Sequence, residues 1–137
     1  KLNQKNIKLL READLILDCT DNLETRFVIN KFCYKEKRAW IYASAIRNEG
    51  YVMPILPKGP CLSCFLKSGN KETCVSEGVL NAITVSIAAL QVNLAVKWLC
   101  GEEVAPLLYY LNLERMQWKK IKVKKNKRCG ICGKADN

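Results

Sequence analysis

Two cysteine pairs, Cys61-Leu-Ser-Cys64 and Cys129-Gly-Ile-Cys132, have the spacing of zinc ligands. A Cys-x-x-Cys turn places two sulfurs on one side of a tight loop, and two such turns supply the four thiolates of a closed, structural zinc site. Ordinary thiols or two disulfides are the alternative. However, the chain shows no secretory segment and is rich in lysine, which favours a cytoplasmic protein with reduced cysteines. We therefore predict that these four residues bind Zn²⁺ and tie the middle of the chain to its end.

The composition restricts the chemistry that this chain can perform. Its 137 residues suffice for one domain with a real core, and they include no histidine. Catalysis by Ser-His-Asp or Cys-His groups, histidine-ligated metals and imidazole acid–base chemistry are therefore excluded within these residues. Carboxylates, lysines, arginines and thiols remain as candidate functional groups.

The formal charge of +10 favours an acidic partner such as nucleic acid, phosphate or an acidic protein. Many basic residues lie between Lys119 and Arg128, where Ile121 and Val123 alternate with lysines in the pattern of a half-buried strand. A solvated edge strand explains this cluster, because lysines protect sheet edges from aggregation. The alternative is a docking surface for a partner. Nucleic-acid binding is not predicted, because no basic helix or aromatic platform accompanies the lysines.

The segment from Asp18 to Arg26 carries a polar turn directly after an apolar run. Such a turn lies at the carboxyl end of a strand, where open α/β sheets bind ligands. Asp21 can offer an oxygen to a Mg²⁺ that bridges phosphates, Asn22 can bond a nucleotide, and Arg26 can meet an anion from the same helix face. The structural alternative is that Asp21 is the N-cap of a helix, in a capping box with Glu24, and that Arg26 is a surface charge.

Cys74 is the second candidate for chemistry. It lies in a polar, aperiodic stretch over residues 66–77, just before a long apolar segment. A thiol near a helix N-terminus is nucleophilic at neutral pH, because the helix dipole favours its thiolate. The alternative is a loop cysteine without a role. Cys19, Cys33 and Cys100 lie in apolar contexts, and we expect all three in the core.

The elements that must position these residues follow from periodicity and turn signals. We expect a helix ending near residue 12, helices over 21–35 and 79–99, and strands over 13–19, 40–45, 50–55, 107–113 and 117–123. The segment 79–99 is long enough to span a membrane, but polar residues interrupt it, so we interpret it as a core or dimer-interface helix. This order predicts an α/β domain with a mixed sheet. The start is abrupt and no G-x-G-x-x-G loop is present, so the chain looks like the second part of a larger domain.

Six ordered motifs resemble the carboxyl-terminal half of ThiF/MoeB-type adenylyltransferases, the relatives of ubiquitin-activating enzymes. The motifs cover nearly the whole chain. They are Asp18-Cys-Thr-Asp-Asn with Arg26, Ala45-Ile-Arg-Asn-Glu-Gly50, Pro60-Cys-Leu-Ser-Cys64, Thr73-Cys-Val-Ser-Glu-Gly-Val79, Leu90-Gln91 and Cys129-Gly-Ile-Cys132. The resemblance implies that residues 1–137 form the second half of a Rossmann-like ubiquitin-activating-enzyme fold with a four-cysteine zinc site.

The resemblance also implies an activity. Such enzymes use ATP and Mg²⁺ to adenylate the carboxyl-terminal Gly-Gly of a ubiquitin-like sulfur carrier protein, and they act as homodimers without a membrane. Asp21 matches the family's metal- and ATP-associated aspartate, with Asn22 beside it, and Cys74 matches a loop cysteine that bonds the carrier tail in some members. The four paired cysteines match the family's zinc ligands. Arg47 and Gly50 belong to a recurrent sequence that we interpret as structural.

Two alternatives remain open at this point. The chain can be a non-catalytic, zinc-stapled module for dimerisation or carrier binding, or a relative that adenylates a peptide or a tRNA base. The family's Gly-rich phosphate loop is absent from these residues. We therefore expect the chain alone to bind ATP poorly and to be inactive, and the enzyme to be the intact protein.

Overall fold

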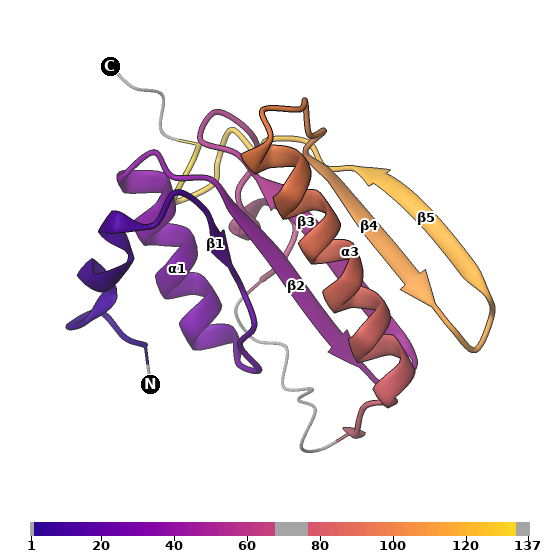
Figure 1. Cartoon of the computed structure of the whole chain (residues 1–137). Helices are drawn as coiled ribbons and strands as arrows, with labels where there is room; N and C mark the ends of the chain where they lie inside the picture. Colours follow the sequence, from indigo (N-terminus) through magenta and orange to yellow (C-terminus); the bar gives the residue numbers. More distant parts are fainter. Residues whose placement is uncertain (1, 68–76, 134–137) are drawn as a thin grey trace.

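One mixed five-stranded sheet runs through the computed structural model, which describes residues 2–67 and 77–133 (Figure 1). The strands lie side by side in chain order; they are β1 (Ile16–Leu17), β2 (Trp40–Ile46), β3 (Glu49–Ile55), β4 (Leu107–Asn112) and β5 (Gln117–Lys122). β1 and β2 are parallel, whereas each later pair is antiparallel. This arrangement confirms the predicted α/β class with a mixed sheet.

Two long helices cover opposite faces of the sheet. α1 (Leu23–Lys35) packs on the face that carries Trp40 and Tyr42, and α3 (Asn81–Leu99) packs on the face that carries Ile41 and Ala43. Successive side chains of a strand point to opposite faces, so the apolar run of β2 supplies both cores. The described residues also form two short 3-10 helices, η1 (Ile7–Glu12) beside α1 and η2 (Leu62–Cys64) within the first cysteine pair.

The first turn of α1 corrects the predicted capping box. Asn22, not Asp21, is the N-cap, and its side-chain oxygen accepts a hydrogen bond of 2.9 Å from the backbone N–H of Thr25. Both side-chain types cap helices well, so the sequence did not separate the two neighbours. Asp21 is therefore not the N-cap of α1, because the helix begins one residue later than that alternative required.

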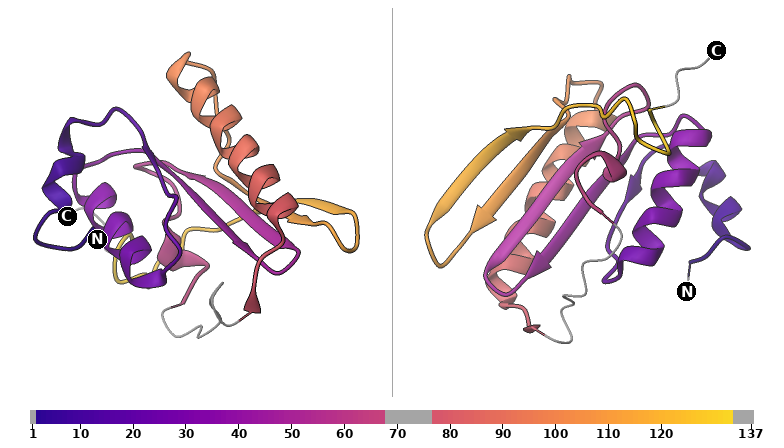
Figure 2. Two further views of the ribbon diagram at one scale, coloured as in Figure 1. Left: turned by 60° about the horizontal axis from the view of Figure 1, so that its bottom comes forward. Right: turned by 180° about the vertical axis from the view of Figure 1, so that it is seen from behind.

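Two further expectations about burial were wrong. Cys33 is buried in the core, but Cys19 and Cys100 are exposed, since each follows the end of an element rather than lying inside it. β5 is the solvated edge strand that the lysines indicated, but the alternation of Ile121 with lysines suggested half-burial, and all six of its residues are exposed. The β4–β5 hairpin extends past α3 at the edge of the sheet, so no helix covers its outer strand (Figure 2).

α3 is a core helix on one side only. Its buried residues face the sheet, and among them the amide of Gln91 donates to the carbonyls of Asp18 and Ile41 at 3.0 and 2.9 Å. Within the described residues, α3 is the one helix whose length and composition would suffice to cross a membrane. The hydrogen bonds from Gln91 to the backbone at the ends of β1 and β2 instead hold α3 against the sheet.

α3 packs closely against the sheet at Gly50. A methyl group at this position would lie 2.2 Å from Cγ1 of Ile87, a side chain held in the core. We predict that Gly50→Ala lowers the free energy of unfolding by about 1–3 kcal/mol, because α3 must shift to relieve the overlap. Urea denaturation measures this change. Gly130→Ala is the matched control, since nothing lies within 4 Å of the added methyl, and equal stability losses in the two variants would contradict the packing argument.

Candidate functional site

The polar turn after β1 lies at the carboxyl end of the parallel strand pair. Asp18 comes directly after the strand, and its side chain is fully buried. The backbone N–H and the hydroxyl of Thr20 both donate to Oδ1 of Asp18, at 2.9 and 2.7 Å. These two bonds fold residues 18–20 into a tight turn, so the next residues lie beyond the carboxyl end of β1.

Arg26 holds this turn from the first turns of α1. Its Nε donates to Oδ2 of Asp18 at 3.1 Å, and its Nη2 donates to the carbonyl of Thr20 at 2.5 Å and to that of Ala43 at 3.2 Å. The guanidinium also lies over the ring of Tyr42, 5.5 Å from the centroid. Arg26 is therefore not a solvated surface charge, because its side chain is only 11% exposed.

The electrostatics of this pair follow from its burial. Desolvation raises the pKa of the Asp18 carboxyl, while the positive charge of Arg26 and the bonds from Thr20 lower it in opposition. The ion pair thus orders the turn rather than serving as a proton donor to solvent. The predicted contact of Arg26 with a nucleotide stays a prediction, and the contacts here give Arg26 a positioning role.

Asp21 and Asn22 stand at the outer end of the ordered turn. Asp21 is exposed, and the Asn22 amide donates to its Oδ1 at 3.2 Å while the Asn22 oxygen caps α1. The structure therefore places an exposed carboxylate at the position where α/β sheets bind ligands. A carboxylate oxygen there suits Mg²⁺, which usually takes one or two carboxylates and completes its shell with phosphate and water.

Arg47 holds the backbone that leads into α3, at the carboxyl end of β2. It follows β2, has a positive φ of 51°, donates its backbone N–H to Gly78 O at 2.9 Å and accepts from Leu80 N at 2.9 Å. Its guanidinium also pairs with Glu77. Cys74, the other predicted catalytic residue, lies outside the described residues.

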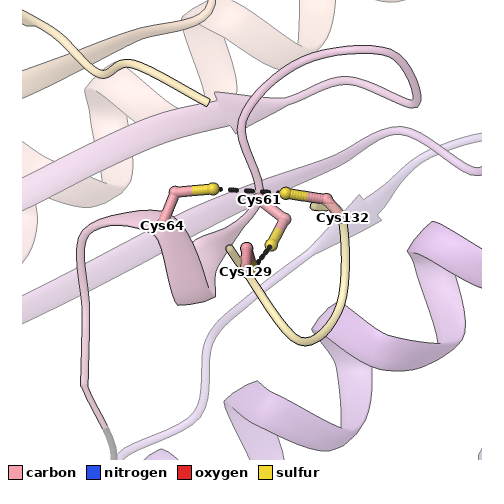
Figure 3. Close-up of side chains that lie close together, drawn as sticks. All are labelled: Cys61, Cys64, Cys129 and Cys132. Atoms are coloured by element: carbon pink, nitrogen blue, oxygen red, sulfur yellow. Dashed lines mark hydrogen bonds between the residues drawn. The ribbon is translucent and has the colours of Figure 1, made fainter. Parts of the chain in front are cut away.

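The four paired cysteines come together, although more than sixty residues separate the pairs. Their sulfurs all lie within 4.8 Å of one another, with Cys61 and Cys129 3.7 Å apart and Cys64 and Cys132 3.2 Å apart (Figure 3). Thiolates bound tetrahedrally at the usual Zn–S length of about 2.3 Å are about 3.8 Å apart. The donor set and its spacing therefore fit Zn²⁺.

Groups around the cluster prepare it for a metal. Burial raises the pKa of the Cys61 and Cys132 thiols, whereas hydrogen bonds from the backbone N–H groups of Cys132 and Ile131 and from the thiols of Cys61 and Cys132 outweigh burial at Cys129 and lower its pKa to about 7. The backbone N–H of Asn126 also donates to the sulfur of Cys64 at 3.4 Å. These donors stabilise thiolate charge, which a metal ligand must carry.

Two functional supports were missed by reasoning from the sequence. Asn30, buried on α1, accepts from the backbone N–H of Leu62 at 3.0 Å and donates to Ser63 at 3.2 Å, so it anchors the first cysteine turn. Gln91 joins α3 to the ends of β1 and β2. Their signal in the sequence was a polar residue on the apolar face of a helix, a pattern that indicates a buried hydrogen bond only once the neighbours are known.

Comparison with known proteins agrees with this arrangement. Residues 1–131 match the ThiF family. The chain belongs to the ThiF family. The sulfur carrier protein ThiS adenylyltransferase of Bacillus subtilis is 31% identical over 134 residues, which cover 94% of this chain and 40% of that protein. The molybdopterin-synthase adenylyltransferase of Escherichia coli is 32% identical over 131 residues, which cover 91% of this chain and 53% of that protein.

The ThiF-family chain thus spans about half the length of these curated relatives. Among solved structures, that of E. coli MccB with ATP superposes with a TM-score of 0.79 over 97% of this chain and 44% of the other, at 15% identity. This likeness confirms the fold, a mixed five-stranded α/β sheet with helices as in structures of this type. At that identity it carries no statement about substrate.

The cysteine cluster yields a prediction on metal content. We expect one Zn²⁺ per chain, and we expect Cys61→Ser and Cys129→Ser each to abolish stoichiometric zinc, because three thiolates hold the ion much more weakly than four. Elemental analysis of purified protein measures the metal, and thermal unfolding measures the accompanying loss of stability. Cys100→Ser, at an exposed cysteine outside the cluster, is the control. Full zinc content in the Cys129 variant would refute the four-cysteine assignment.

Proposed function

We propose that the intact protein is an ATP-dependent adenylyltransferase that activates the carboxyl-terminal Gly-Gly of a ubiquitin-like sulfur carrier protein. One observation carries the proposal: the exposed Asp21 carboxylate, presented at the carboxyl end of the β1–β2 pair by a turn that a buried ion pair holds in place. The two curated relatives support it, because their names state adenylyltransferases acting on ThiS and in molybdopterin synthesis.

The chemistry suits a chain without histidine. The carrier's terminal carboxylate attacks the α-phosphorus of ATP, a new acyl–phosphate bond forms, and pyrophosphate leaves with the electron pair of the broken bond. The attacking group is already ionised at neutral pH, so the reaction needs positioning and charge neutralisation more than proton transfer. Asp21 would hold a Mg²⁺ that neutralises phosphate charge, Asn22 would bond the nucleotide, and Arg26 would keep the turn rigid.

The proposal assigns activity to the intact protein rather than to these 137 residues alone. A Gly-rich phosphate loop does not occur in the sequence, and the chain covers 40% and 53% of the two relatives. The chain alone would therefore bind ATP poorly. The reduced cysteines of the zinc site and the soluble substrates of this reaction support a cytoplasmic location.

A carrier protein would find an open face on the antiparallel part of the sheet. Seen from behind, no helix crosses β4 and β5 (Figure 2, right). The rings of Tyr51 and Tyr110 contact each other there, tilted by 37° with their centroids 5.1 Å apart, and the ammonium of Lys119 lies 5.8 Å from the centroid of Tyr110. Aromatic rings with a positive rim suit a partner that is apolar at its centre and acidic around it. We propose that the carrier docks on this face and that two copies of the protein form the working homodimer.

Asp21 provides the test of the enzymatic proposal. We predict that Asp21→Ala lowers carrier-dependent exchange between ATP and pyrophosphate by about 100-fold or more in the intact protein, because phosphate charge loses its stabilising group. Asp14→Ala removes a similarly exposed aspartate that precedes β1 and should leave exchange unchanged. Normal exchange by the Asp21 variant would exclude this residue from the mechanism.

Cys74 provides a second test, on the fate of the acyl-adenylate. We predict that the carrier forms a thiol-sensitive covalent adduct with the protein after ATP is added, because a thiolate can displace AMP from the activated carboxylate. Intact-protein mass spectrometry detects the adduct with and without reductant. Cys74→Ala should lack it, whereas Cys100→Ala, at an exposed cysteine, should retain it. An undiminished adduct in the Cys74 variant would make that cysteine a bystander.

A non-catalytic module is the competing proposal. The four-cysteine cluster agrees with it, because such a cluster has a structural role. Such a module would bind the carrier or self-associate without turning over ATP. The exchange assay on the intact protein separates the two, since only the enzyme returns labelled pyrophosphate to ATP. Replacing the carrier by a peptide or by tRNA in the same assay tests the remaining alternative substrates.

A further inference from the structure

A groove of about 490 Å³ lies between η1 and α1, on the opposite side of the sheet from α3. The two helices contact each other there (Figure 1). The volume falls within the range of small-molecule sites, about 300–1,000 Å³. Asp21 does not line the groove, and the cysteine turns contribute only Ser63 and Ile131 to it. The proposed function therefore gives this groove no role.

Five apolar side chains line the groove. α1 supplies Phe27, Val28 and Phe32, η1 supplies Ile7, and the second cysteine turn supplies Ile131. All of them except the buried Phe32 are half-buried, so part of their apolar surface faces solvent inside the groove. Water gains free energy of contact poorly at such surface, and a ligand that covers it is therefore favoured.

Basic side chains surround this apolar lining. Lys31 and Lys35 come from α1, Lys8 and Arg11 come from η1, and all four are exposed. In each helix the two basic residues are three or four positions apart, a spacing that places both on the same side. Long basic side chains lay their methylene groups along apolar surface and keep the charge at its edge. The groove is thus apolar inside and positive at its rim.

Carboxylates only partly neutralise the rim. Glu24 and Glu36 also line the groove, and Glu36 pairs with Arg11 at 3.3 Å. The three lysines of the rim form no ion pair with a carboxylate of residues 2–67 or 77–133. Four basic and two acidic residues leave a net charge of +2 around the groove. An anion in the groove would compensate this charge.

We propose that the groove binds a small amphipathic anion, an alkyl or aryl carboxylate. Its apolar body would lie against Phe27, Val28 and Ile131, and its carboxylate would pair with the ammonium groups of Lys8 and Lys31. The rim disfavours a cation, and an inorganic anion would leave the apolar lining uncovered. A groove of this size suits a small molecule better than a protein partner, which usually covers about 800 Å². This inference goes beyond the proposed adenylyltransferase function and does not depend on it.

Two probes of the same shape and opposite charge test the rim. Decanoate should bind the intact protein saturably, and decylammonium should bind at least about 10-fold more weakly, because the lysines attract only the anion. Isothermal titration calorimetry measures both dissociation constants. Equal affinities would overturn the proposal. Absence of decanoate binding would also overturn it, since another part of the intact protein would then fill the groove.

A series of shorter carboxylates tests the apolar lining. Affinity should rise from butanoate through hexanoate and octanoate to decanoate, by up to about fourfold for each methylene that the groove covers. The same calorimetric titrations measure the series. Affinities that are independent of chain length would mean ion pairing with surface lysines alone, and the proposed groove site would be rejected.

Charge reversal tests which lysines attract the anion. Lys31→Glu, at an exposed position of the rim, should weaken decanoate binding at least about 10-fold and strengthen decylammonium binding. Lys122→Glu is the matched control, because it makes the same change at an exposed position of β5, the edge strand farthest from β1. It should leave both affinities unchanged. Equal effects of the two variants would mean that the net charge of the protein, not the groove, attracts the anion.

A filling substitution tests the location without a change of charge. Val28→Trp should occupy the groove and weaken decanoate binding at least about 10-fold. Val96→Trp adds the same side chain at an exposed position of α3, outside the groove, and should bind decanoate normally. Thermal unfolding verifies that both variants remain folded. Undiminished decanoate binding by the Val28 variant would place the anion elsewhere and overturn the inference.

Discussion

The ion pair between Asp18 and Arg26 is the interaction on which the candidate site depends. Its carboxylate is fully buried, and its guanidinium, which α1 carries, bonds both the turn after β1 and the backbone of β2. Removing one partner of a buried pair typically costs about 3–5 kcal/mol, because the other charge is left without compensation. The position of Asp21 is therefore constrained, because moving the turn would break its bonds to Arg26 of α1, which is itself bonded to β2.

The cysteine cluster and Asn30 extend this constraint across the domain. Asn30 joins α1 to the first cysteine turn, and the cluster joins that turn to residues 129–132. α1 is thus held at its first turn by Asp18 and farther along by the cysteine turn. The proposed reaction would gain from such a frame, because it depends on positioning and small displacements of reacting groups lower a rate steeply. Zn²⁺ bound by the four cysteines would act as a scaffold and would take no part in the reaction.

Short-range patterns in the sequence predicted most of this, and tertiary contacts account for the rest. The Cys-x-x-Cys spacing predicted the cluster, because the geometry of each half is local. The cap of α1 was misplaced by one residue, since Asp21 and Asn22 have equal capping tendencies and only the backbone of Thr25 decides between them. Arg26 resembled a surface charge because its partner lies in another element. The exposure of β5 depends on where α3 stops covering the sheet, and no pattern within β5 contains that information.

α3 shows why an apolar helix is ambiguous when only its sequence is known. Apolar residues occupy nearly its whole circumference, which is compatible with a core, a membrane and an interface. The structure separates two sides of the helix: Ile87 and Gln91 belong to the side that the sheet buries, whereas Val85 and Val92 are exposed on the other. Apolar residues occur on both sides, so they do not identify the packed one. Gln91 does, because a buried amide requires partners and the sheet supplies the two carbonyls that it bonds.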